Sequence, residues 1–247
     1  MMTLPTLETQ KFEIQIPSTG KVVEYRPYLV KEEKILMMAA ESKDNIQAMK
    51  AMKEIVQACT FEKINVNKLT LFDLEYIFLK LRTKSVGESA KIKLKCEKCN
   101  EYTPATVDLT SVEIVFVKPE EPEYQDKDIK LTDNIGIILQ YVNVEKMMKF
   151  SNLESDSNVD KLKVLNELVV ASIASVYDMS TTYNSADCSN EELVKFVDSM
   201  SRSQLEKIEK FISSTPKLQK AIKFTCHTET CKHDNDIVLS GLQSFFV

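Results

Sequence analysis

Four of the six cysteines in this 247-residue chain occur in two close pairs, and cysteine pairs can bind metal ions. Cys96 and Cys99 form a C-x2-C motif, and Cys226 and Cys231 form a C-x4-C motif far downstream. A structural zinc ion takes four tetrahedral ligands, usually cysteine thiolates or thiolates with histidine. The two pairs together therefore predict a structural zinc site made by Cys96, Cys99, Cys226 and Cys231.

Both histidines of the chain lie beside the second pair. Because the C-x4-C gap is longer than usual, His233 or His227 is the reserve ligand if one cysteine does not reach the metal. Three other interpretations stay open: thiols without metal, a redox pair, and a catalytic zinc, which would need an open coordination position and an acid–base partner. Zinc is preferred over iron on geometry and prevalence.

Lysines flank both cysteine pairs. Four thiolates around one Zn²⁺ leave a local charge of about −2, which nearby ammonium groups would offset. The lysines concerned are Lys93, Lys95, Lys98, Lys223 and Lys232. They could equally be ordinary outward-facing strand residues. Contact with nucleic acid is disfavoured by the net charge of −5 and the absence of tryptophan.

Each cysteine pair lies between two expected strands. The first pair has Ala90–Lys95 before it and Thr106–Leu109 after it, with a further strand at Val112–Val117; the second lies between Ile222–Phe224 and Ile237–Leu239. Two strand–knuckle–strand units that face each other form the zinc-ribbon arrangement. The two unpaired cysteines have no assigned function: we expect Cys59 to be small and buried and Cys188 to be exposed in a polar loop.

The remaining pattern predicts an α+β protein with an N-terminal β-hairpin, a helix-rich body, and a zinc-ribbon-like pair of Cys-bearing β-hairpins that staples the chain. The N-terminal hairpin is expected from strands at 12–16 and 22–28 around a Pro-Ser-Thr-Gly turn. Helices are expected at 31–41, 44–58, 71–82, 134–150, 159–176, 190–199 and 202–213. The methionines at 37, 38, 49 and 52 suit core filling better than an adaptable binding surface.

We expect three parts along the chain. Residues 1–88 would form the N-terminal hairpin with helices, 89–117 and 217–247 the zinc-ribbon-like module, and 118–216 a helical insertion. The acidic, proline-containing segment 118–128 would be a linker at the start of that insertion.

Composition favours a non-enzymatic protein of a reducing compartment. Hydrophobic residues make up 43% and charged residues 28% of the chain, which excludes wholesale disorder. The sequence has no apolar run of membrane-spanning length, and its first residues do not form a secretory signal, so we expect a cytoplasmic location. No glycine-rich phosphate loop and no G-x-S-x-G motif occur, and the two histidines beside the cysteines offer little for acid–base catalysis.

Several segments resemble a known family. They are IPSTGK at 16–21, YRPYLVKEEKIL at 25–36, FDLEYIFLKLR at 72–82, KSVGE at 84–88, the first cysteine pair, and GLQSFF at 241–246. Together they resemble the baseplate hub proteins of T4-like contractile-tailed bacteriophages, described as hub subunits or hub assembly proteins. The resemblance is strongest over about 12–109 and returns at about 222–246.

The resemblance implies a non-enzymatic role in building the central hub of the tail baseplate, in the host cytoplasm. The first hypothesis is a chaperone-like assembly factor that binds another hub or tail protein, with the tape-measure protein as one candidate. The alternative is a permanent structural subunit of the hub in the virion tail. A second alternative is a zinc-ribbon nucleic-acid-binding regulatory protein, which a salt-dependent DNA titration would separate from the others.

Overall fold

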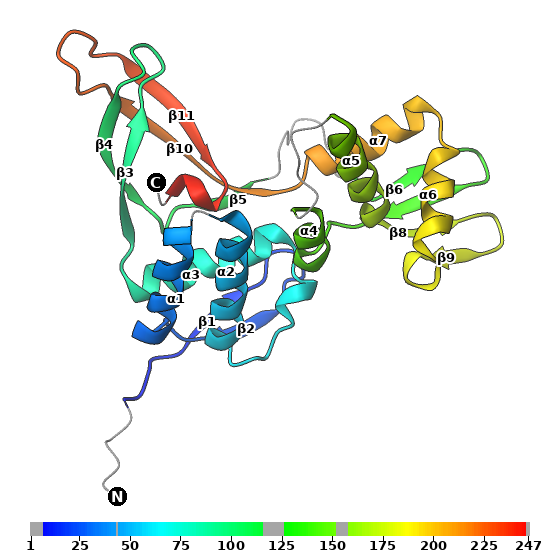
Figure 1. Ribbon diagram of the computed structural model, residues 1–247, viewed down its shortest axis with the longest axis horizontal. Coiled ribbons are helices and arrows are strands. Elements are labelled where there is room, and N and C mark those ends of the chain that lie inside the picture. Colours follow the sequence, from blue (N-terminus) through cyan, green and yellow to red (C-terminus); the bar gives the residue numbers. More distant parts are fainter. Residues whose placement is uncertain (1–6, 43, 116–125, 152–157, 246–247) are drawn as a thin grey trace, which may run out of the picture. The chain divides into compact units, whose positions relative to one another are not determined.

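The computed structural model describes residues 7–42, 44–115, 126–151 and 158–245 (Figure 1). It confirms the predicted α+β class, with an N-terminal hairpin, several helices and two cysteine-bearing hairpins. The chain forms two compact units, unit 1 from residues 1–115 and 217–247 and unit 2 from residues 116–216. The predicted three-part division stays a prediction, and most of the expected linker at 118–128 lies outside the described residues.

The described residues of unit 1 form the N-terminal hairpin, three α-helices, two short 3-10 helices and both cysteine-bearing hairpins. Its elements are β1 (Phe12–Gln15), β2 (Val22–Tyr25), α1 (Val30–Ser42), α2 (Asn45–Cys59), η1 (Val66–Lys68), α3 (Leu71–Ser85), β3 (Ser89–Lys95), β4 (Tyr102–Asp108), β5 (Glu113–Val115), β10 (Lys217–Thr225), β11 (Asp234–Ser240) and η4 (Leu242–Phe245). The predicted hairpin and first three helices are confirmed, with ends that differ by a few residues. Figure 1 labels the strands and α-helices of this unit.

The N-terminal hairpin is fastened to the start of α3 by one buried carboxylate. Thr70 caps α3, and Asp73 completes a capping box with it. The same Asp73 carboxylate accepts from the Ser18 backbone N–H at 2.9 Å and from the Ser18 hydroxyl at 2.5 Å. These two bonds join the turn of the N-terminal hairpin to the first turn of α3, 55 positions further along the chain.

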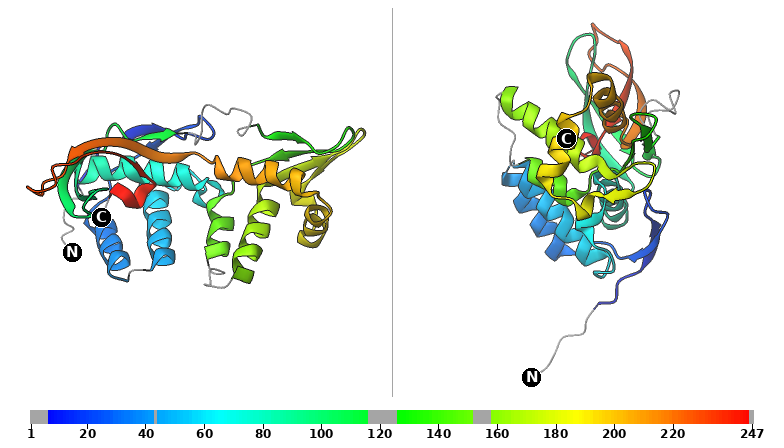
Figure 2. Two further views of the ribbon diagram at one scale, coloured as in Figure 1. Left: turned by 90° about the horizontal axis from the view of Figure 1, so that it is seen from above. Right: turned by 90° about the vertical axis from the view of Figure 1, so that its right-hand side faces the viewer.

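The two cysteine-bearing hairpins are joined at their bases. β10 pairs with β5 as well as with β11, in a three-stranded antiparallel sheet. The ammonium group of Lys220 on β10 donates to the Asp108 backbone oxygen and to the Ser111 hydroxyl, each at 2.5 Å. The β3–β4 and β10–β11 hairpins accordingly lie side by side in Figure 1 and in the left view of Figure 2.

Unit 2 combines a four-stranded antiparallel sheet with four α-helices among its described residues. The elements are β6 (Asp128–Lys130), β7 (Gly136–Leu139), α4 (Val144–Ser151), α5 (Asn158–Ser172), β8 (Ile173–Tyr177), β9 (Thr182–Asn184), η3 (Ser185–Asp187), α6 (Asn190–Asp198) and α7 (Arg202–Ser213). The sheet order is β6-β7-β8-β9. Its core is formed by residues from β7, α5, β8, α6 and α7, including Ile137, Val169, Ile173, Leu193, Ile208 and Phe211.

The prediction of one helix over 134–150 is wrong. Residues 136–139 form β7, and α4 begins at Val144. The apolar run Ile137–Leu139 is too short for its periodicity to separate strand from helix. β8 likewise occupies the end of the helix predicted at 159–176, and it pairs with β7 across the sheet. The helices predicted at 190–199 and 202–213 are confirmed as α6 and α7, and each begins with a capping box, at Ser189 and at Ser201.

Candidate metal centre

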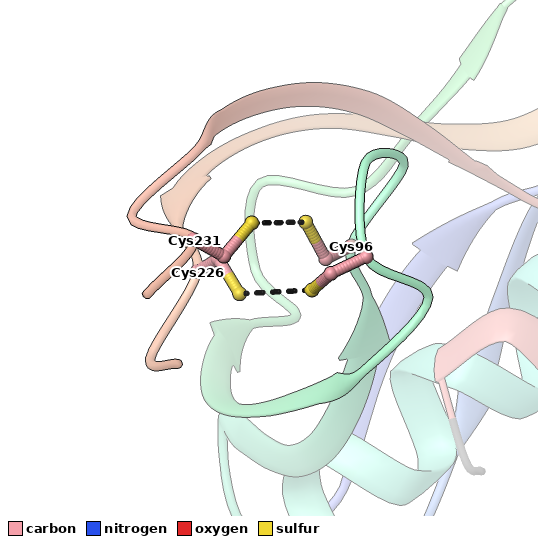
Figure 3. Close-up of side chains that lie close together, drawn as sticks. Cys96, Cys226 and Cys231 are labelled. Carbon is pink, nitrogen blue, oxygen red and sulfur yellow. Dashed lines mark hydrogen bonds between the residues drawn. The ribbon is translucent and has the colours of Figure 1, made fainter. Parts of the chain in front are cut away.

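The four paired cysteines lie together at the tips of the two hairpins. Cys96 and Cys99 lie in the β3–β4 turn, and Cys226 and Cys231 in the β10–β11 turn. All four Sγ atoms lie within 4.8 Å of one another. Sulfur contacts join the hairpins, from Cys99 to Cys226 at 3.5 Å and from Cys96 to Cys231 at 3.9 Å. Figure 3 shows Cys226 and Cys231 facing Cys96, with the sulfur atoms pointing toward one another.

The two turns close in the same way although their lengths differ. The N–H of Cys96 donates to the Glu101 oxygen at 2.9 Å, and the N–H of Cys226 donates to the His233 oxygen at 2.8 Å. In both turns the acceptor is the second residue after the second cysteine. Each bond closes a loop at the hairpin tip and holds the first cysteine beside the end of the turn.

In both turns the residue after the second cysteine has a left-handed backbone conformation. Asn100 has φ +63° and Lys232 has φ +42°. Asparagine tolerates this conformation, whereas lysine adopts it only where the surrounding structure imposes it. The second turn is two residues longer than the first. It contains an additional tight turn between its cysteines, in which the Cys231 N–H donates to the Thr228 oxygen at 3.0 Å. The long C-x4-C gap therefore does not prevent Cys231 from reaching the other three sulfur atoms.

Backbone N–H groups donate to the sulfur atoms of Cys96 and Cys226. The N–H groups of Cys99 and Lys98 donate to Cys96 and lower the pKa of its thiol to about 6. The Thr228 hydroxyl and N–H lower the pKa of the Cys226 thiol in the same way. Such N–H···S bonds stabilise thiolates, which are the form of cysteine that binds metal.

Cys99 shows the opposite shift. The Glu101 N–H acts to lower the pKa of its thiol, but burial and the three neighbouring sulfur atoms raise it well above its usual value. Four thiolates so close together repel one another unless a cation lies among them. A divalent metal ion would supply that charge.

The sulfur positions fit a tetrahedral thiolate site better than disulfides. Sulfur atoms about 2.3 Å from a central zinc stand about 3.8 Å apart in a regular tetrahedron. The two contacts of 3.5 and 3.9 Å bracket that value. A disulfide needs a separation of about 2.05 Å, and all four cysteines are free thiols here. The donor set can therefore hold one soft or borderline divalent ion.

The reserve histidines do not join the cluster. His227 lies with its Nδ1 3.3 Å from the Thr103 hydroxyl, and His233 contributes its backbone oxygen to the turn. Of the other cysteines, Cys59 is fully buried as predicted, while Cys188 is only partly exposed and belongs to unit 2. The flanking lysines Lys93, Lys95, Lys98, Lys223 and Lys232 are all exposed.

Sequence reasoning missed two polar residues next to the cluster, Asn235 and Thr103. Both are buried on the inner faces of their hairpins. Each lies four residues after the second cysteine of its pair, and this shared spacing was the signal available in the sequence.

The fold and this cluster define an α+β protein of two compact units, with a four-cysteine cluster between paired hairpins in unit 1. Residues 8–247 match the family described as T4 bacteriophage base plate protein, and the chain belongs to that family. Comparison with curated proteins and with solved structures gives no match. Among the described residues, none of the helices combines the length and the apolar character that crossing a membrane requires.

Proposed function

We propose that this protein is a non-enzymatic assembly factor for the baseplate hub, one that binds another hub or tail protein until the baseplate closes. The observation that carries the proposal is the family match over residues 8–247. Assembly of the baseplate would take place in the host cytoplasm. The tape-measure protein, one partner suggested by the sequence resemblance, stays a prediction.

An exposed apolar surface on α1 supports a holding role. Met37 is 61% exposed and Met38 is 72% exposed, so these two methionines do not fill the core. Met38 lines an open hollow of about 480 Å³ between α1 and α2. Ile35, Ala39 and Ala51 supply the rest of its apolar lining, and Gln47, Lys50 and Glu54 supply its polar lining. Methionine side chains are flexible and polarisable and suit surfaces that bind and release apolar segments.

We further propose that Cys96, Cys99, Cys226 and Cys231 bind one structural zinc ion. Four protein ligands close the coordination sphere and leave no position for a substrate, so the role is structural. The ion would join two chain segments that are far apart in sequence. It would thereby hold the two hairpins together at their tips, while the β5–β10 pairing holds them at their bases.

A permanent structural subunit of the hub is the second candidate function. The family's description, which names the base plate itself, favours it. Quantitative mass spectrometry of partly assembled baseplates and finished phage particles from one infection separates the two candidates. An assembly factor is present in the intermediates and absent from finished particles. A fixed copy number in finished particles would instead establish the structural subunit, and absence from both would contradict both candidates.

A further inference from the structure

Asn235 links the two hairpins beside the cluster. It lies on β11, is 3% exposed, and reaches the other hairpin. Its Oδ1 accepts from the Glu97 N–H at 2.9 Å, and its Nδ2 donates to the His233 oxygen at 3.0 Å. The same Nδ2 lies 3.6 Å from Cys96 Sγ, within hydrogen-bond range for sulfur, and 3.5 Å from the Phe224 oxygen.

The orientation of this amide is fixed by its partners. Turning it over would place the NH₂ group against the Glu97 N–H and the oxygen against the His233 oxygen. Both arrangements oppose like groups, a donor to a donor and an acceptor to an acceptor. The Asn235 NH₂ group is therefore held toward Cys96.

Thr103 makes the reciprocal link from the first hairpin to the second. It lies on β4 and is buried, and its hydroxyl oxygen accepts from the His227 N–H at 3.2 Å. The hydroxyl also lies 3.3 Å from His227 Nδ1, to which it can donate. Thr103 contacts the residue directly after Cys226 and lies four residues after Cys99, as Asn235 lies four residues after Cys231.

We propose that Asn235 and Thr103 are positioning residues that clamp the two cysteine turns against each other, and that Asn235 also donates a hydrogen bond to the Cys96 thiolate. The inference rests on the zinc site proposed above. Residues that hold the ligands of a metal site in place typically account for a 10- to 100-fold difference in metal affinity. The clamp explains how two turns of different length bring their thiolates to one point.

Three variants of the full-length chain test the clamp. Asn235→Asp keeps the acceptor for Glu97, removes the donor to Cys96 and to the His233 oxygen, and adds a negative charge. Thr103→Val keeps the shape and removes the acceptor for His227. Thr106→Val is the matched control, because Thr106 lies on the same strand but is exposed.

Zinc affinity is measured by competition with a chromophoric chelator, and the sulfur-to-metal charge-transfer band is recorded with Co²⁺. We expect Asn235→Asp to weaken zinc binding about 10- to 100-fold and to shift the Co²⁺ band, because it changes a bond to sulfur. Thr103→Val should weaken binding without shifting the band, because Thr103 does not touch sulfur. Thr106→Val should match the parent, and Thr103→Ser, which retains the hydroxyl, should restore binding.

The outcomes separate this inference from the zinc proposal. If the parent binds one Co²⁺ with a four-thiolate spectrum while Asn235→Asp and Thr103→Val keep parental affinity within twofold, the clamp is wrong and the zinc site stands. If the parent binds no metal, the zinc site fails and the clamp with it. Should Asn235→Asp not fold, the Thr103→Val and Thr103→Ser pair decides: equal affinities overturn the clamp.

Discussion

Short-range hydrogen bonds give each cysteine turn its shape. In each turn the N–H of the first cysteine donates to the backbone oxygen of the second residue after the second cysteine. The residue just before that acceptor has a left-handed backbone conformation. Because the two spacings that mark the cysteine pairs are short, all four candidate ligands could be named from the sequence, and the structure brings their sulfur atoms within 4.8 Å of one another. The links made by Asn235 and Thr103 join residues more than 120 positions apart, and only the structure shows them.

The first prediction concerns the cysteines themselves. Cys96→Ser and Cys226→Ser should each lower the free energy of unfolding by roughly 3–5 kcal/mol, because zinc binds the folded site and not the unfolded chain. Cys188→Ser should change it by less than about 1 kcal/mol, because Cys188 belongs to unit 2. Thermal and urea unfolding in the presence of zinc measure all three.

A chelator provides the control. It should lower the melting temperature of the parent to that of Cys96→Ser and leave that of Cys96→Ser unchanged. If all three serine variants lower the free energy of unfolding by equal, small amounts, a metal ion does not stabilise this fold.

At the scale of elements, the C-terminal turn η4 is tied to α3 by a partly buried carboxylate. Glu75 on α3 accepts a hydrogen bond from the Leu242 N–H, where η4 begins. Burial raises the pKa of Glu75 to about 7, although the Leu242 N–H and the nearby Lys217 act to lower it. Leu242 and Phe245 of η4 are themselves buried.

The second prediction is a pH dependence of stability. Between pH 4.5 and about 7 the folded chain holds the Glu75 proton more tightly than the unfolded chain does. Stability therefore falls as the pH rises through this window. Glu75→Gln should remove this dependence of the free energy of unfolding on pH. At pH 8 it should stabilise the protein by up to about 3 kcal/mol.

Urea unfolding of the parent and of Glu75→Gln at pH 5 and pH 8 measures this difference. The exposed Glu41→Gln is the control and should keep the parental slope. A parental slope in Glu75→Gln would show that burial of Glu75 does not govern the pH response.

The third prediction tests α1 as the holding surface. Met37→Asp combined with Met38→Asp should change stability by less than about 1 kcal/mol, because both side chains are exposed. The double variant should nevertheless fail to support production of finished phage in a complementation assay. Met179→Asp, at a methionine of unit 2 that is 83% exposed, should support it fully. Full activity of the double variant would exclude α1 as the holding surface.

Local signals explain which elements could be predicted from the sequence. The caps at Thr70, Ser189 and Ser201 satisfy nearby backbone groups, so four residues of sequence suffice to place each helix start. The pairing of β7 with β8 depends on contacts such as that of Ile137 with Val176. These two residues are separated in the sequence by the helices α4 and α5. Such long-range pairing leaves no periodic trace in a four-residue strand, and for this reason the sheet of unit 2 was not predicted.

At the scale of the whole molecule, the two units should respond differently to metal removal, which is the fourth prediction. All four candidate ligands belong to unit 1, whereas unit 2 has its own apolar core. A chelator should therefore increase amide hydrogen exchange in β3, β4, β10 and β11 and leave that of β7, β8 and α7 unchanged. Amide hydrogen exchange, detected by mass spectrometry with and without chelator, measures the difference between the two units. Equal acceleration in both units would show that the metal stabilises the whole chain.

The metal content of the purified full-length chain tests the central claim most directly. Elemental analysis combined with native mass spectrometry should find one zinc ion per chain in the parent and none in the Cys96→Ser, Cys226→Ser double variant. A parent that is folded and metal-free, or lighter by the mass of about four hydrogens because two disulfides have formed, would contradict the claim that these cysteines hold a structural zinc ion.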